Sequence, residues 1–195
     1  MGIFDTLFGR QKPVPPAKNE RLFAISTADV TLQTQEDMRP AQTAGLCFQG
    51  IASAPFKQIN QELEELLKIA SNDGEAPVTA KSYEDKLGYK WVLIASEDFQ
   101  QIVTTVHVVS QKLIDEGYGD VLLAAVFRFN DEKGKPVYFI YNYKRGNFYP
   151  FVPRPDSHSH QRNNGDEMRL GTVMKRDLPM EPELERWFAM WDLPF

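Results

Sequence analysis

The sequence VLLAAVFRF at residues 121–129 is followed by NDEKGKP at 130–136 and by VYFIYNYK at 137–144. The two outer segments are rich in β-branched and aromatic residues, which favour strands. The polar segment between them contains Gly134 and Pro136, which are typical of turns. Together the three segments predict a β-hairpin.

Two helices are predicted upstream of this hairpin, because apolar residues recur there at helical spacing. The first covers residues 56–70 and follows Ser53, a suitable N-cap. The second covers residues 99–113 and follows the acidic stretch 96–98, which suits the positive end of a helix. The β-branched run at 102–109 makes a strand the rival interpretation, but the length, the capping and the apolar stripe favour a helix.

Further strands are predicted at residues 44–52, 78–84, 89–95 and 148–152. From residue 44 to residue 144 the order is therefore strand, helix, strand, then strand, helix, strand, and one more strand. This order matches an α+β fold in which two helices cover one face of a mainly antiparallel sheet, in a split βαβ or ferredoxin-like arrangement.

The ends of the chain are predicted to differ in character. Residues 1–19 combine a short amphipathic N-terminal helix with a basic, proline-rich linker, and residues 20–195 form a single domain. Residues 20–42 are ambiguous, with a short helix at 21–25 and an extended piece at 30–33.

The last third of the chain is predicted to hold a polar, flexible loop at 155–166, within the polar stretch 154–167, and a C-terminal helix at 181–191. In that helix Leu184, Trp187, Phe188 and Trp191 would form an apolar side docked on the domain.

The composition narrows the possible functions. A formal net charge of -5 argues against binding to nucleic acid, whose protein partners usually carry a basic patch. The single cysteine, Cys47, cannot form an internal disulfide, which favours a reducing compartment and predicts a cytoplasmic protein. No apolar run reaches the length of about 18 residues that a membrane-spanning helix needs.

Catalytic and metal sites have only weak candidates. Asp156, His158 and His160 could share a metal in an extended segment, but their polar, turn-rich surroundings are more typical of an exposed loop. His107 is better interpreted as a partly buried side chain, and Cys47 as a small buried hydrophobe. We therefore predict no catalytic residues, no metal and no cofactor. The alternative is a hydrolase or transferase whose site is assembled from residues distant in sequence.

A dense group of aromatic and basic residues lies at 141–149. Aromatic and arginine side chains are common anchors of protein interfaces, so this group is a candidate partner-binding surface. The equal alternative is that alternate rings face the core and that only the two cations mark a turn. The candidate residues are Tyr141, Tyr143, Lys144, Arg145, Phe148 and Tyr149.

Three segments carry a family resemblance: MGIFDTLFGR at 1–10, YKRGNFYPFVP at 143–153 and LPMEPELERWFAMW at 178–191, with GLCF at 45–48 in a comparable place. Together they resemble the PspAB family, the phage-shock-protein-A-associated proteins. The resemblance implies a non-enzymatic accessory role in a membrane or envelope stress response, alongside the membrane-remodelling protein PspA. It implies no catalytic residues.

The N-terminal segment is a candidate for binding an anionic membrane surface, which would make the protein peripheral at the inner face of the membrane. Apolar side chains that insert beside cations are typical of a helix lying in the membrane interface. The apolar candidates are Ile3, Phe4, Leu7 and Phe8, and the basic candidates are Arg10 and Lys12.

We expect the intact chain to co-sediment weakly and reversibly with anionic liposomes, and a chain lacking residues 1–12 to lose this binding. Each basic residue near such a surface contributes about 1 kcal/mol, and a helix of two turns has little stability of its own in water. Equal sedimentation of the two chains, or a large loss of thermal stability on truncation, would instead show that residues 1–12 belong to the folded domain.

Overall fold

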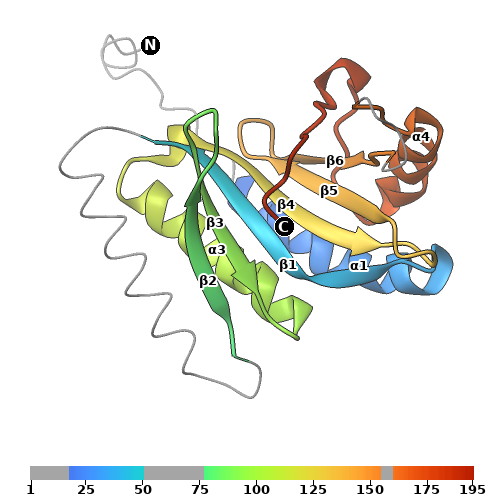
Figure 1. Cartoon of the computed structure of the whole chain (residues 1–195), viewed down its shortest axis with the longest axis horizontal. Helices are drawn as coiled ribbons and strands as arrows, with labels where there is room; N and C mark the ends of the chain where they lie inside the picture. Colours follow the sequence, from blue (N-terminus) through green and yellow to red (C-terminus); the bar gives the residue numbers. More distant parts are fainter. Residues whose placement is uncertain (1–17, 51–76, 155–159) are drawn as a thin grey trace, which may run out of the picture.

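A computed structural model describes residues 18–50, 77–154 and 160–195. Its centre is a six-stranded antiparallel sheet in the order β2-β3-β1-β4-β5-β6, and the described part of the chain also contains three α-helices (Figure 1). The strands are β1 Arg39–Gln49, β2 Thr79–Glu84, β3 Tyr89–Ala95, β4 Leu122–Asn130, β5 Pro136–Asn142 and β6 Asn147–Phe151. The helices are α1 Ala24–Gln35, α3 Phe99–Asp115 and α4 Asn164–Val173.

The hairpin predicted from residues 121–144 is present as β4 and β5. The strands pair in a register that places Phe127 opposite Phe139. In the turn, the Asp131 carboxylate accepts hydrogen bonds from the backbone N–H groups of Lys133 and Lys135, at 2.9 and 2.7 Å. Gly134 has a φ of 74°, a conformation that favours glycine.

The other strands confirm the predicted α+β class. β1 lies between β3 and β4 and is antiparallel to both, while β2 pairs with β3. The helix predicted at 56–70 lies outside the described residues. Because the ferredoxin-like arrangement requires that helix between β1 and β2, this detail stays a prediction.

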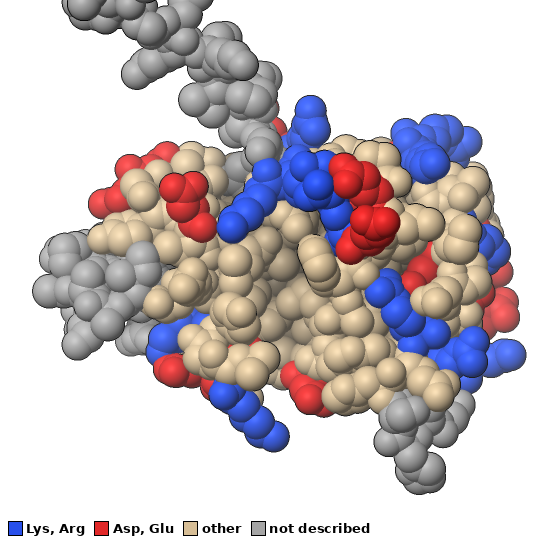
Figure 2. All heavy atoms as spheres, turned by 90° about the horizontal axis from the view of Figure 1, so that it is seen from above, with Lys and Arg blue, Asp and Glu red and all other residues tan. Residues whose placement is uncertain are grey.

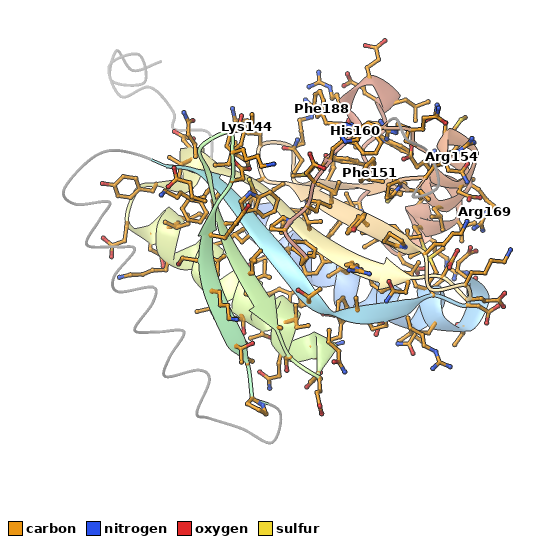
Figure 3. The ribbon with its side chains drawn as sticks, in the orientation of Figure 1. Lys144, Phe151, Arg154, His160, Arg169 and Phe188 are labelled. Carbon is orange, nitrogen blue, oxygen red and sulfur yellow. The ribbon has the colours of Figure 1, made fainter. Side chains whose placement is uncertain are left out.

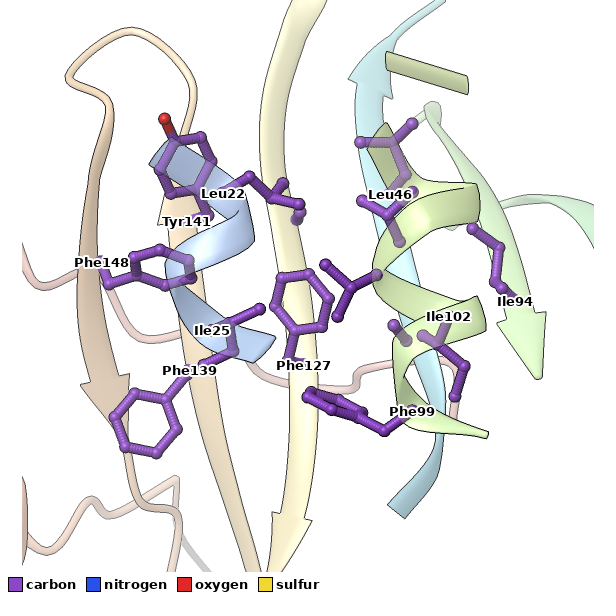
Figure 4. Close-up of a cluster of buried hydrophobic side chains, with 14 of the residues drawn as sticks. Leu22, Ile25, Leu46, Ile94, Phe99, Ile102, Phe127, Phe139, Tyr141 and Phe148 are labelled. Atoms are coloured by element: carbon purple, nitrogen blue, oxygen red, sulfur yellow. The ribbon is translucent and has the colours of Figure 1, made fainter. Parts of the chain in front are cut away.

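One face of the sheet packs against α1 and α3 (Figures 1 and 4). The Asp98 side chain caps α3 by accepting a hydrogen bond from the Gln100 N–H at 2.8 Å. The helix then places Phe99 edge-on to Phe127 and Phe129, with ring centroids 6.1 and 5.4 Å apart. This helical stripe forms as predicted, because its β-branched residues are buried against the sheet and packing outweighs their strand propensity.

The prediction of an extended piece at 30–33 was wrong. These residues belong to α1, whose side chains Ile25, Ala28 and Leu32 are fully buried. The helix has no marked amphipathic pattern of its own, since Asp29 and Thr31 are also buried. Packing on the sheet therefore determines its conformation more than local sequence does.

The opposite face of the sheet is covered by the last residues of the sequence. A second buried cluster combines sheet residues such as Trp91, Val126 and Ile140 with Trp187, and residues 189–195 pack on it (Figure 1). The sheet thus has apolar layers on both faces.

The prediction of a helix at 181–191 was also wrong. Only Leu184–Arg186 form a short 3-10 helix. The preceding residues lie beside β6, where the Phe148 N–H donates to the Pro179 carbonyl and the Glu181 N–H donates to the Phe148 carbonyl, both at 2.8 Å. These hydrogen bonds hold the backbone extended in the region where the predicted helix would begin.

The polar stretch predicted as a loop at 154–167 is partly helical. α4 begins at Asn164, and the Asn163 side chain caps it by accepting from the Asp166 N–H at 3.4 Å. The helix has little amphipathic pattern, because Glu167 is buried with Leu170, so apolar periodicity did not reveal it. Residues 155–159 of the predicted flexible loop lie outside the described residues.

We expect Trp187→Ala to lower the free energy of unfolding by about 3–5 kcal/mol, the usual cost of removing a buried large aromatic side chain. Trp187 is only 8% exposed. Its ring lies so close to Gly171 that a Cβ there would be 2.4 Å from the Trp187 Cη2 atom, and its indole N–H donates to the Glu181 carbonyl at 3.0 Å. Urea unfolding measures the loss.

Phe188→Ala is the matched control, because this neighbouring aromatic is 60% exposed. It should change the free energy of unfolding by no more than about 0.5 kcal/mol. Equal effects of the two substitutions would contradict the docked position of Trp187.

Candidate binding surface

The six residues of the aromatic and basic group do not share one environment. Tyr141 and Phe148 are fully buried, and Tyr143 and Tyr149 nearly so. Burial raises the pKa of all three tyrosines, so their phenols stay neutral. The four aromatic side chains therefore belong to the core, as one of the two sequence interpretations expected. This corrects the predicted partner-binding surface of six residues. Only Lys144 and Arg145 are exposed enough to contact a partner.

Lys144 and Arg145 lie in the turn between β5 and β6. Lys144 is exposed, and the Arg145 side chain is 37% exposed. In this turn the N–H of Gly146, which has a φ of 71°, donates to the Asn142 carbonyl at 2.7 Å. The turn therefore places Lys144 and Arg145 at the surface, while the aromatic side chains of the flanking strands are buried.

Arg145 connects this turn to the segment after α4. Its Nε donates to the nearly buried Glu181 carboxylate at 3.2 Å, and its Nη2 donates to Glu183 at 3.1 Å. Arg186 donates in turn to Glu183 at 2.7 Å. These contacts bring two of the three segments that carry the family resemblance, 143–153 and 178–191, against each other.

Two large apolar side chains lie exposed within the second of these segments. Leu184 is 53% exposed and Phe188 60% exposed, although the predicted helix assigned both to its buried side. Leu184 is adjacent in sequence to Glu183 and therefore to the ionic contacts of Arg145. Figure 3 shows Phe188 and Lys144 toward the same end of the molecule. We call Lys144, Arg145, Leu184, Arg186 and Phe188 the signature surface.

Figure 2 shows the molecule from above the view of Figure 1. Lys, Arg, Asp and Glu side chains lie around much of the periphery, and uncharged residues, polar and apolar together, fill the centre of this view (Figure 2).

A second ionic contact joins β6, α4 and the last segment of the chain. Glu167, 2% exposed, accepts from the Val152 N–H at 2.9 Å and from the Arg162 Nε at 2.8 Å. Arg162 also donates to the Trp187 carbonyl at 2.6 Å and lies 5.7 Å from the Phe151 ring centroid. The buried charge thus has a cation and a backbone donor, as a stable buried carboxylate requires.

The candidate catalytic residues are not brought together. Cys47 is buried in β1, and burial, with a smaller contribution from the negative charge of Asp85, raises the pKa of its thiol to about 12. It is therefore not a thiolate at neutral pH, the form that a nucleophile needs. His107 packs against Phe23 in another part of the molecule, with ring centroids 4.5 Å apart.

Of the two loop histidines, only His160 lies within the described residues. Asp156 and His158 lie outside the described residues, whereas His160 stacks on Trp191, with ring centroids 4.8 Å apart. In the described ranges, no group of three His, Cys, Asp or Glu side chains is placed to hold a metal ion. The candidate membrane residues Ile3, Phe4, Leu7, Phe8, Arg10 and Lys12 also lie outside the described residues.

The whole chain, residues 1–195, matches the family model described as PspA associated protein B. The chain belongs to the PspAB family. No curated protein and no solved structure matches it. The family is that of a PspA-associated protein, and no described helix of this PspAB chain is long and apolar enough to cross a membrane.

Sequence reasoning missed the buried carboxylates of this PspAB protein. Glu167 and Glu181 are each 2% exposed, yet both lie in strongly polar stretches that look solvated. Their partners, Arg162 and Arg145, are 5 and 36 residues away. Only the tertiary contacts show that these acids are structural.

We expect Arg162→Met to lower the free energy of unfolding by about 3–5 kcal/mol, because it leaves the buried Glu167 charge without its cation. The double variant Arg162→Met with Glu167→Gln removes that charge and should be more stable than the single variant. Chemical denaturation of both variants measures the difference. If the double variant is the less stable of the two, the unpaired charge is not the cause.

Proposed function

We propose that this protein is a non-enzymatic accessory protein of a phage-shock-type membrane or envelope stress response, and that it binds a PspA-like partner through the signature surface. Membership of the PspAB family supports the partner. The observation that carries the surface is the contact of Arg145 with Glu181 and Glu183, which joins two of the sequence segments that resemble the family into one surface.

The signature surface has the features of a preorganised interface. Arg145 is already held by the nearly buried Glu181, so binding would cost it little conformational entropy. Leu184 and Phe188 would gain burial on binding, and fully burying such a side chain is worth about 1.5–3 kcal/mol relative to exposure. Lys144 adds an exposed cation that suits an acidic or amphipathic partner surface.

The N-terminal segment is a second part of this proposal. Residues 1–19 would bring the protein to an anionic membrane surface at the cytoplasmic face, where a membrane-remodelling partner acts. The apolar cluster at the start of the sequence, followed by a basic stretch, supports this role. Weak membrane binding and weak partner binding would reinforce each other through avidity.

We expect Phe188→Ser and Lys144→Glu each to weaken binding of a purified PspA-like protein from the same organism. Loss of a central aromatic anchor typically costs at least about 2 kcal/mol, or about thirtyfold in affinity. The charge reversal should act mainly on the association rate and should depend on salt. Surface plasmon resonance at two salt concentrations measures both effects.

Matched controls lie outside the signature surface. Leu87→Ser removes an apolar side chain that is 83% exposed in the turn between β2 and β3, and Lys175→Glu reverses an exposed cation after α4. Both control variants should bind like the unchanged chain. Equal binding by all four variants would place the partner site elsewhere.

A further inference from the structure

The two helices that cover the sheet present a row of exposed side chains on their outward side. α1 and α3 lie side by side (Figure 1), and the Gln100 side chain donates to the Ser26 carbonyl at 3.4 Å. The Phe23 and His107 rings join them a little further along, with centroids 4.5 Å apart. We call the following exposed residues the helix face: Phe23, Thr27, Val30, Gln101, Thr104 and Val108.

The helix face lacks charge to an extent that the composition does not explain. Charged residues make up 25% of the whole chain. Residues 99–111 of α3 contain none, and the only one in α1 is Asp29, which is buried. Phe23, Val30 and Val108 are nevertheless 38%, 61% and 48% exposed. Depletion of charge around apolar side chains is typical of the core of an interface.

The N-terminal segment joins the domain beside this face. The short 3-10 helix η2, Lys18–Phe23, is the first described element and packs against α3. As the chain runs from η2 into α1, its contacts with α3 move back from His107 to Gln100, so the two run antiparallel. The start of η2 therefore lies toward the C-terminal end of α3, at the edge of the helix face.

The linker is long enough for the apolar part of that segment to reach the whole face. A proline-rich chain extends by about 3.1 Å per residue, so residues 9–17 can span about 28 Å. α3 has 17 residues, which at about 1.5 Å each make it about 25 Å long. The apolar side chains within residues 3–8 are therefore within reach of any part of the helix face.

Charge also matches the basic linker to this part of the domain. The linker carries Arg10 and Lys12. Among the described side chains around the C-terminal end of α3, the acids Glu20, Asp115, Glu116 and Asp120 outnumber the cations Arg21 and Lys112. The helix dipole adds negative potential at the same end. The acidic end would hold the linker, while the apolar cluster ahead of it meets the uncharged face.

We propose that, away from a membrane, residues 3–8 dock on the helix face. This docking rests on the membrane role proposed for residues 1–19 and adds its regulation, because the face and the membrane compete for the same apolar side chains. The tether gives the segment an effective concentration in the millimolar range, so even a weak contact stays occupied. Transfer of the segment to an anionic membrane uncovers the helix face.

Paramagnetic relaxation in the absence of vesicles tests the docking. A nitroxide on the intact chain with Thr104→Cys should remove most of the amide signal intensity of residues 3–8 from the nuclear magnetic resonance spectrum. The same label with Asp192→Cys, a side chain 85% exposed in the segment on the opposite face of the sheet, should leave those signals unchanged. Cys47 is buried and stays unlabelled. Persistence of the signals beside the Thr104→Cys label, or equal loss with both labels, would overturn the docking.

The same spectra identify any other occupant of the helix face. Loss of the signals of residues 56–70 in place of those of residues 3–8 would assign the face to that predicted helix. Signal loss in a mixture of spin-labelled chains and separately isotope-labelled chains would assign it to a second copy. Either result would contradict docking of the N-terminal segment within its own chain.

A substitution in the helix face tests the competition with a membrane. Val108→Glu in the intact chain should weaken the docking and so tighten binding to vesicles of phosphatidylserine and phosphatidylcholine about fivefold, because a larger fraction of the segment is free to bind. Met168→Glu is the matched control, since it places the same charge at an apolar side chain that is 56% exposed on α4, and it should not tighten binding. Unchanged or weaker binding by the Val108→Glu chain would sink the competition. If no form of the chain binds vesicles, the membrane role and the competition fail, whereas the docking itself stands or falls on the nitroxide experiment.

Discussion

The burial of both faces of the sheet is the constraint on which the rest of the structure depends. β4 and β5 carry apolar side chains on both faces, so that Phe127 and Val126, neighbours in sequence, are both fully buried on opposite sides. A strand of this kind is stable only with a packed layer above and below it. α1 and α3 form one layer, and Trp187 with the C-terminal residues 189–195 forms the other. The C-terminal segment is thus part of the core.

This two-sided packing places particular demands on polar groups. The segment that leads to Trp187 crosses the edge of the sheet beside β6, where its backbone forms hydrogen bonds with the backbone of Phe148. Glu181 and Glu167 are buried at this crossing, and Arg145 and Arg162 neutralise them. Removing either arginine would leave an unpaired buried charge, which explains why such polar residues occur inside the fold.

The same crossing also determines which side chains stay exposed. It joins two of the segments that carry the resemblance to the PspAB family and leaves Leu184 and Phe188 exposed at the surface. The side chains that could suggest catalysis are placed differently, since Cys47 is buried with a raised thiol pKa and His107 packs against Phe23.

The sequence alone determined strands β2 to β6, residues 44–49 of β1, α3 and the α+β class, because their alternation, helical stripe and turn residues are local signals. It also carried the family resemblance. It did not reveal that β1 begins at Arg39. It misplaced α1, α4 and the predicted helix at 181–191, since buried polar residues in the first two and pairing with β6 in the third outweigh local periodicity. Only the tertiary structure decided that Tyr141 and Phe148 lie in the core, that Phe188 is exposed, and that Phe195 sits over Gly45. These placements depend on which segments distant in the chain meet across the sheet, and no local pattern encodes such a meeting.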